Sequence, residues 1–317
     1  MSLELDGIAL VDDVGFTVEH GEVLALMGES GCGKSLTAMA LMRLLPPTIG
    51  LVRGSIRLEG EELTRLDEPQ MASLRGRRIS MIFQEPTASL DPLASVGGQI
   101  VEAITIHEKV GRAAAKARAL AMLAAVGIPD PERRLAQHPF ELSGGMCQRI
   151  MIAIALACGP AVLVADEPTT ALDVTIQAQI LDLMRKLVAE RGTGVVLITH
   201  DMGVVADIAD RVAVMYAGRL AEVAPVHALF ATPRHPYTAL LLASVPRLGL
   251  QPKAGLRSIE GTVPPAHRLG AGCRFASRCP LVADQCNHRA PPLVDAGQGH
   301  LVACWRSAEV AAMRGAS

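Results

Sequence analysis

The feature that most limits the fold of this chain is the stretch 28–35, which reads Gly-Glu-Ser-Gly-Cys-Gly-Lys-Ser. It fits the pattern G-x-x-x-x-G-K-[ST] and lies between an apolar run at 23–27, typical of a buried strand, and a helical pattern from Leu36. Glycines let such a loop curve until backbone N–H groups point at phosphate oxygens, and the helix N-terminus favours an anion. We therefore predict a nucleoside triphosphate site, with Lys34 on the β- and γ-phosphates and the Ser35 hydroxyl on Mg²⁺. The residues of this phosphate loop are Gly28, Glu29, Ser30, Gly31, Cys32, Gly33, Lys34 and Ser35.

Composition narrows the class of partner. The 317 residues carry a formal net charge of −2, which argues against a nucleic acid held by a basic field.

The first six residues are acidic where a secretory signal would be basic, so we expect no leader. The apolar stretch 150–165 is interrupted by Gly159-Pro160, and neither piece is long enough to span a bilayer. We expect a soluble chain that reaches a membrane only through a partner.

Apolar runs that predict strands, at 79–83, 162–165, 195–199 and 212–216, alternate with helical patterns. Such alternation favours a largely parallel sheet with helices on its faces. A mostly helical region interrupts the pattern, and we predict an inserted helical subdomain at about 86–160. After Phe230 prolines become frequent and four cysteines follow. This shift predicts a nucleotide-binding domain at 1–232 and an irregular C-terminal extension at 233–317.

Two further segments carry chemistry. An apolar strand ends in Asp166 and Glu167, and ligands bind at the carboxyl ends of strands in open α/β sheets. Asp166 suits Mg²⁺, and Glu167 suits the orientation or deprotonation of an attacking water. A second helix begins after Ser143, which caps it, while Gly144 and Gly145 allow an anion close to the backbone.

Taken in order, these features resemble an ATP-binding-cassette (ABC) ATPase. The phosphate loop corresponds to Walker A, Gln84 to the Q-loop, residues 142–146 to the signature, and 166–167 to Walker B. Two further family motifs follow, with Asp173 in the D-loop and His200 in the H-loop. The resemblance implies a P-loop cassette with a mostly parallel sheet, an antiparallel β subdomain and a helical subdomain, followed by the cysteine-containing extension.

The resemblance also implies roles for these residues. Two cassettes would face each other head to tail, so that each ATP lies between one Walker A and the opposite signature. Ser35, Gln84 and Asp166 would organise Mg²⁺, while Glu167 acts on the water and His200 contacts the γ-phosphate. The residues expected to complete the partner's ATP site are Ser143, Gly144, Gly145 and Gln148.

Other stretches are similar to one subfamily, the importers of dipeptides, oligopeptides and nickel. They are residues 83–93, the run His-Pro-Tyr-Thr-Ala-Leu at 235–240, and the cysteine-containing extension. This similarity implies a peripheral ATPase at the cytoplasmic face of the bacterial inner membrane. Its partners would be a second, non-identical cassette, two membrane permease subunits and an extracytoplasmic solute-binding protein. Residues 84–93 and the helical subdomain would receive the coupling helix of a membrane subunit, although residue types alone equally allow a turn-rich surface loop.

The extension cysteines have the spacing C-x5-C-x6-C-x17-C. A cytosolic location disfavours two disulfides, so a metal staple is a reasonable expectation. Three alternatives stay open: the [4Fe–4S] cluster that the subfamily resemblance implies, zinc with mixed ligation by His288 or His300, and unliganded thiols. The residues concerned are Cys273, Cys279, Cys286 and Cys304.

Several alternatives concern function and base recognition. Nickel or another small solute is the alternative within the subfamily, because the cassette does not touch the solute. A non-transport ABC ATPase acting on DNA or ribosomes is disfavoured by the absence of a second cassette and of a basic stripe in this sequence.

Phe16 is the only aromatic residue before Gly28, and its alternation with Val14 and Val18 predicts a strand residue facing the core. The sequence therefore offers no clear aromatic partner for adenine.

Overall fold

The computed structural model describes residues 1–169, 174–244 and 259–315, which form two compact units. The first unit comprises Met1–Thr17, Leu24–Glu59 and Thr199–Ser317, and the second comprises Val18–Val23 and Gly60–Ile198. The predicted extension therefore falls in the same compact unit as the phosphate loop, and the boundary at residue 232 stays a prediction.

The strand that leads into the phosphate loop is β3, whose five residues are all buried. It pairs in parallel with β10, and β10 pairs in an antiparallel manner with β11. The extension contributes β12 and β13, which continue the sheet from β11 in the order β12-β13-β11-β10-β3. We missed the last two strands in the sequence because each is only two residues long. The strands are β3 (Val23–Met27), β10 (Arg211–Tyr216), β11 (Arg219–Pro225), β12 (Val294–Asp295) and β13 (Leu301–Val302).

A second sheet of the first unit is antiparallel, with the order β2-β1-β4, and corresponds to the expected antiparallel subdomain. The segment that follows β2 contains no strand, and Phe16 in it is half-buried. The prediction of Phe16 as a strand residue facing the core is therefore wrong, because alternation over three apolar residues is too short to define a strand. The strands of this sheet are β1 (Ser2–Leu5), β2 (Ile8–Val11) and β4 (Ile49–Arg53), and the short β5 (Arg57–Leu58) lies outside it.

The helices of the first unit include α1, which begins directly at Lys34. Helix α9 has Asp201 as its N-cap, whose carboxylate accepts the N–H groups of Gly203 and Val204 at 2.7 and 3.3 Å. The helices are α1 (Lys34–Leu41), α9 (Met202–Ile208), α10 (Val226–Ala231), α11 (Pro236–Ala243), α12 (Asp284–His288) and α13 (Val310–Gly315).

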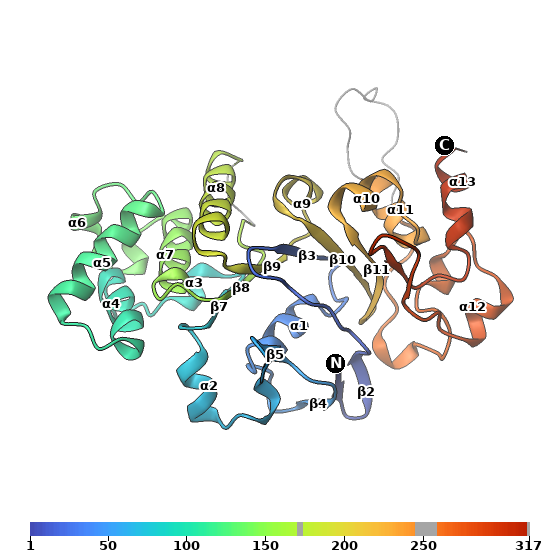
Figure 1. Ribbon diagram of the computed structural model, residues 1–317, viewed down its shortest axis with the longest axis horizontal. Coiled ribbons are helices and arrows are strands. Elements are labelled where there is room, and N and C mark those ends of the chain that lie inside the picture. Colours follow the sequence, from blue (N-terminus) through green and yellow to red (C-terminus); the bar gives the residue numbers. More distant parts are fainter. Residues whose placement is uncertain (170–173, 245–258, 316–317) are drawn as a thin grey trace. The chain divides into compact units, whose positions relative to one another are not determined.

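The second unit contains three parallel strands in the order β9-β8-β7, as the apolar runs predicted. Helices α4, α5, α6 and α7 gather on one side of this unit (Figure 1), in the region expected for the helical subdomain. The strands are β6 (Glu61–Glu62), β7 (Ile79–Ile82), β8 (Val162–Asp166) and β9 (Gly194–Ile198). The helices are α2 (Glu68–Leu74), α3 (Pro86–Ser89), α4 (Val96–His107), α5 (Arg112–Ala125), α6 (Pro131–Arg134), α7 (Gly144–Leu156) and α8 (Val174–Arg191). Among the described helices, none combines the length and the apolar character needed to cross a membrane.

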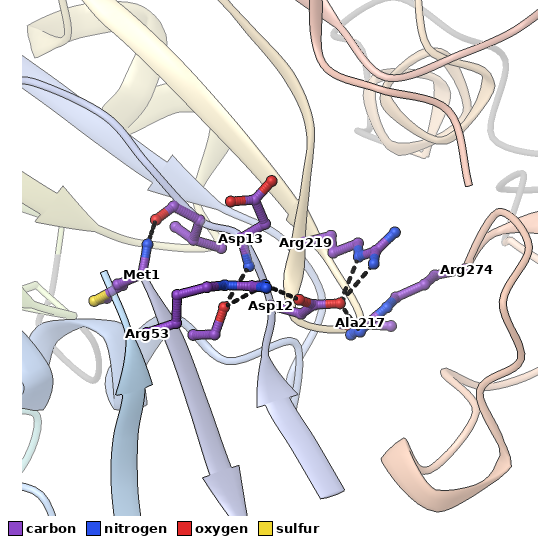
Figure 2. A network of polar contacts seen from close by, with 9 residues as sticks. Met1, Asp12, Asp13, Arg53, Ala217, Arg219 and Arg274 are labelled. Atoms are coloured by element: carbon purple, nitrogen blue, oxygen red, sulfur yellow. Dashed lines mark hydrogen bonds and ion pairs between the residues drawn. The ribbon is translucent and has the colours of Figure 1, made fainter. Parts of the chain in front are cut away.

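Asp12 joins three arginines within the first unit (Figure 2). Its carboxylate accepts hydrogen bonds from Arg219 at 2.6 and 2.9 Å, from Arg274 at 3.0 Å and from Arg53 at 3.5 Å. Burial raises the pKa of Asp12, but the hydrogen bond from Arg219 and the charges of all three arginines outweigh it and lower the pKa below its usual value. This network connects the segment after β2 with β4, with β11 and with the extension.

Candidate functional site

The phosphate loop has a backbone that only glycine accepts at its first position. Gly28 has a φ of 149°, and a Cβ atom there would lie 2.2 Å from the carbonyl oxygen of Met215 and 2.7 Å from the Sγ of Cys32. Gly33, with a φ of 100°, adopts the left-handed conformation directly before α1. These two glycines let the loop pack closely against β10 and then enter the helix.

Backbone and lysine hydrogen bonds hold the loop closed. The N–H of Gly218 donates to the carbonyl of Cys32 at 2.9 Å. The Nζ of Lys34 is buried and donates to the carbonyls of Gly28 at 2.7 Å and Glu29 at 3.1 Å. The ammonium group therefore sits inside the curve of the loop, next to the N-terminus of α1, and a helix N-terminus favours an anion.

Glu29 has two hydrogen-bonding partners outside the phosphate loop. Its N–H donates to the hydroxyl of Tyr237 at 2.9 Å, and its carboxylate pairs with Arg278 at 2.6 Å. Both partners belong to the C-terminal extension. Sequence reasoning missed Tyr237 and Arg278, because contacts across 208 and 249 residues leave no signal in local spacing.

Cys32 is a buried small residue of the loop. Burial raises the pKa of its thiol, and this effect exceeds the opposing charge of Lys34. A raised thiol pKa is the opposite of what a reactive cysteine requires.

Strand β8 delivers two carboxylates to its carboxyl end. Asp166 is its last residue and is buried. Glu167 follows with a φ of 50°, and its N–H donates to the carbonyl of Ile198 on β9 at 2.8 Å. A non-glycine residue in the left-handed region is uncommon and is found preferentially at functional sites. This backbone gives Glu167 a direction different from that of Asp166.

Two other predicted site residues are exposed, and each follows a strand that pairs with β8. Gln84 comes two residues after the end of β7, and His200 comes two residues after the end of β9. Since β7 pairs in parallel with β8, the Q-loop glutamine and the Walker B carboxylates follow strand ends at the same edge of the second unit's sheet. Asp173 lies outside the described residues.

The predicted signature residues divide into two groups. Ser143 caps α7 by accepting the N–H of Met146 at 3.4 Å, and Ser143 and Gly144 are exposed while Gly145 is half-buried. Gln148 is only 1% exposed, and its amide donates to the carbonyl of Pro168 at 2.6 Å. Gln148 is therefore held by a hydrogen bond inside the chain, and its contact with a partner's ATP stays a prediction. It connects the signature helix to the loop after Walker B.

Comparison with known proteins agrees with this arrangement. Residues 11–170 match the family described as ABC transporter, and residues 221–286 match the family described as oligopeptide/dipeptide transporter, C-terminal region. The chain belongs to the ABC transporter family. The cassette is therefore an ATPase with the P-loop fold predicted from its motifs.

Relatives match almost the whole chain. A probable peptide ABC transporter ATP-binding protein of Sinorhizobium fredii is 53% identical over 94% of this chain and 89% of its own length. A dipeptide transport ATP-binding protein of Bacillus subtilis is 49% identical over the same shares of the two chains. Among solved structures, the cassette MJ0796 in a dimeric post-hydrolysis state with ADP and phosphate has a TM-score of 0.64 and 27% identity. That match covers 71% of this chain and 95% of the solved one.

The four cysteines of this ABC transporter extension line one cavity, together with Phe275 and Trp305. The cavity volume is about 10 Å³, roughly what a single water needs. Burial raises the pKa of Cys279 and of Cys304 to about 11. The cysteines are Cys273, Cys279, Cys286 and Cys304.

The expectation of a metal staple is therefore not supported. Among the described residues, no group of three or more His, Cys, Asp and Glu side chains is arranged to hold a metal ion. The Nε2 of His300 is already within 2.6 Å of a Glu222 oxygen, and His288 is exposed with its Nδ1 2.9 Å from the carbonyl of Asp284. Within the described part of the chain, the four extension cysteines form no disulfide.

A buried polar cluster fixes the start of the extension. Glu222 of β11 is fully buried and accepts the N–H groups of Arg234 at 2.6 Å and His235 at 3.0 Å in addition to the contact with His300. His235 in turn accepts the N–H of Tyr237 through its Nδ1 at 3.0 Å and caps α11. These bonds satisfy groups that would be costly to bury unpaired.

The stability of the extension should depend on pH through His235. This side chain is 3% exposed, and burial lowers its pKa to about 4 despite the charge of Glu222. Between an unfolded pKa of 6.5 and this folded value, the unfolded chain binds a proton that the folded chain does not. The free energy of unfolding should therefore fall as the pH drops through this window, by roughly 3 kcal/mol at most.

Chemical denaturation at a series of pH values measures this effect. We expect His235→Asn to show a smaller loss of stability than the wild type between pH 6.5 and pH 4. The exposed His227 of α10 provides the control variant His227→Asn. Equal pH dependence in wild type and His235→Asn would show that His235 does not carry this effect.

Proposed function

We propose that this ABC ATPase powers the import of dipeptides and oligopeptides. The observation that carries the proposal is the double match, in which a cassette is followed by an oligopeptide/dipeptide transporter C-terminal region. Relatives at about half identity are described as peptide and dipeptide transport ATP-binding proteins, and they match over more than nine-tenths of this chain. Import of nickel or another small solute is the alternative, since no residue of the cassette needs to contact the solute.

The proposed chemistry is hydrolysis of ATP with Mg²⁺. The loop N–H groups and Lys34 hold the phosphates, and Ser35, Gln84 and Asp166 organise Mg²⁺ and its waters. Glu167 orients or deprotonates the attacking water, and His200 contacts the γ-phosphate. Ser143, Gly144 and Gly145 complete the ATP site of a facing cassette by stabilising charge on the γ-phosphate. No metal group is proposed for the cysteine cavity.

The proposed partners are a second, non-identical cassette, two membrane permease subunits and an extracytoplasmic solute-binding protein. The described surface of the helical subdomain supports a docking role, because Leu93 is 88% exposed and Phe140 is 75% exposed. Large apolar side chains on a surface favour contact with another protein. Docking there places the chain at the cytoplasmic face of the bacterial inner membrane as a peripheral subunit.

Uptake by a strain that lacks this gene tests the proposed solute. The strain is complemented with the wild type or with Glu167→Gln, and labelled dipeptides, longer peptides and nickel are supplied side by side. We expect the wild type alone to restore peptide uptake. If the wild type restores uptake of nickel but not of peptides, the proposal of peptide import is wrong and nickel is the solute.

A further inference from the structure

The second residue of the phosphate loop is held by the C-terminal extension from two directions. The Tyr237 hydroxyl accepts the N–H of Glu29 at 2.9 Å. The two terminal nitrogens of Arg278 donate to the two carboxylate oxygens of Glu29 at 2.6 and 3.0 Å. This is the paired geometry in which arginine binds a carboxylate most strongly. The Arg278 side chain is 5% exposed and that of Glu29 is 28% exposed, so water screens the pair only in part.

Both extension residues are fixed before any nucleotide binds. Tyr237 is fully buried, with ring centroids 4.8 Å from Tyr216 and 5.4 Å from Phe275. Arg278 also donates to the carbonyls of Glu260 at 2.8 Å and Gly261 at 3.2 Å. Their positions are thus set by packing and hydrogen bonds outside the loop.

A second connection reaches the other side of the loop. Arg274 pairs with Asp12 and donates to the carbonyl of Ala217 (Figure 2). The neighbouring Gly218 donates its N–H to the carbonyl of Cys32 at 2.9 Å. One short segment of the extension, residues 273–279, therefore supports the phosphate loop at two residues. It holds Glu29 directly through Arg278, and it holds Cys32 indirectly through Arg274, Ala217 and Gly218.

The charge of Glu29 gives these contacts a consequence for ATP. A carboxylate in the second position of the loop lies close to the bound triphosphate, and two anions in such proximity repel each other. Arg278 pairs with this carboxylate and neutralises its charge. The N–H of Glu29 is also committed to Tyr237, which fixes the direction of the peptide that follows Gly28.

We propose that Arg278 and Tyr237 are positioning residues for ATP, and that through them the C-terminal extension sets the nucleotide affinity of the phosphate loop. Glu29 is the residue through which they act. This inference uses the ATP binding of the cassette and does not depend on which solute is carried.

Nucleotide affinity of the purified full-length chain, measured with a fluorescent ATP analogue, tests the proposal. We expect Arg278→Gln to raise the Kd about tenfold, because it leaves the Glu29 carboxylate unpaired beside the phosphates. Tyr237→Phe, which removes only the hydroxyl, should raise the Kd about threefold. ATP hydrolysis should show a raised KM in both variants, with kcat at saturating ATP within about twofold of the wild type.

A second substitution distinguishes a role in positioning Glu29 from a role in merely attaching the extension to the cassette. Adding Glu29→Gln to Arg278→Gln removes the unpaired charge and should return the Kd to within about threefold of the wild type. Arg306→Gln is the matched control, because Arg306 pairs with Glu309 within the extension. The proposal is overturned if Arg278→Gln and Tyr237→Phe lower the melting temperature without changing Kd or KM. Failure of Glu29→Gln to restore the affinity of Arg278→Gln overturns it as well.

Discussion

Replacement of Glu167 by glutamine should leave ATP binding intact and lower the rate of hydrolysis at least about a hundredfold, the usual contribution of a general base. Glu167 follows the buried end of β8 in a left-handed backbone, anchored by its N–H to Ile198. Glutamine keeps the size and hydrogen-bonding capacity of the side chain but cannot take a proton from water. Dimers of the variant should therefore close on ATP and persist.

Phosphate release and ATP-analogue binding, measured on the same preparation, check this prediction. Glu190, exposed near the end of α8, supplies the control variant Glu190→Gln, for which we expect the wild-type rate. Hydrolysis at the wild-type rate by Glu167→Gln would contradict the assignment of Glu167 as the residue that acts on water.

Gly28→Ala should be the most damaging single substitution in the phosphate loop. The added Cβ would lie 2.2 Å from the backbone oxygen of Met215, a separation that only a shift of the loop or of β10 can relieve. Overpacking of this kind costs about 1–3 kcal/mol, and the displaced loop should also lose its affinity for ATP.

Gly31→Ala is the control within the same loop. A Cβ at Gly31 meets no atom within 4 Å, so the variant suffers only the strain of a positive φ of 78°. That strain is about 1–2 kcal/mol. Thermal unfolding and ATP-analogue binding should therefore place Gly28→Ala well below Gly31→Ala in both stability and affinity. Equal values for the two variants would show that the close approach to Met215 is unimportant.

The residues that sequence reasoning placed well are those whose position follows from local pattern. Buried strands such as β3 and β8 are short apolar runs, and helix α7 has its cap and its glycines adjacent in sequence. The phosphate loop is likewise defined by eight consecutive residues between a strand and a helix. Each of these features is encoded within a few residues of the site that it forms.

Sequence reasoning missed contacts between residues that are distant in sequence. Gln148 belongs to the signature by position, and the structure adds a hydrogen bond from its amide to the carbonyl of Pro168. Glu29 belongs to the phosphate loop by position, but Arg278 determines where its carboxylate lies. The cysteine spacing suggested a metal staple, whereas the described residues include no group of three or more His, Cys, Asp and Glu side chains arranged to hold a metal ion. No local pattern carries such information.

ATP-driven uptake by membrane vesicles that contain the assembled transporter tests the central claim most directly. The vesicles carry either the wild-type cassette or Glu167→Gln, with ATP supplied on the cassette side and labelled dipeptide with its binding protein on the other. We expect dipeptide to accumulate only with the wild type and only with ATP. Accumulation that is equal in the two preparations, or independent of ATP, would contradict the claim that hydrolysis by this chain powers peptide import.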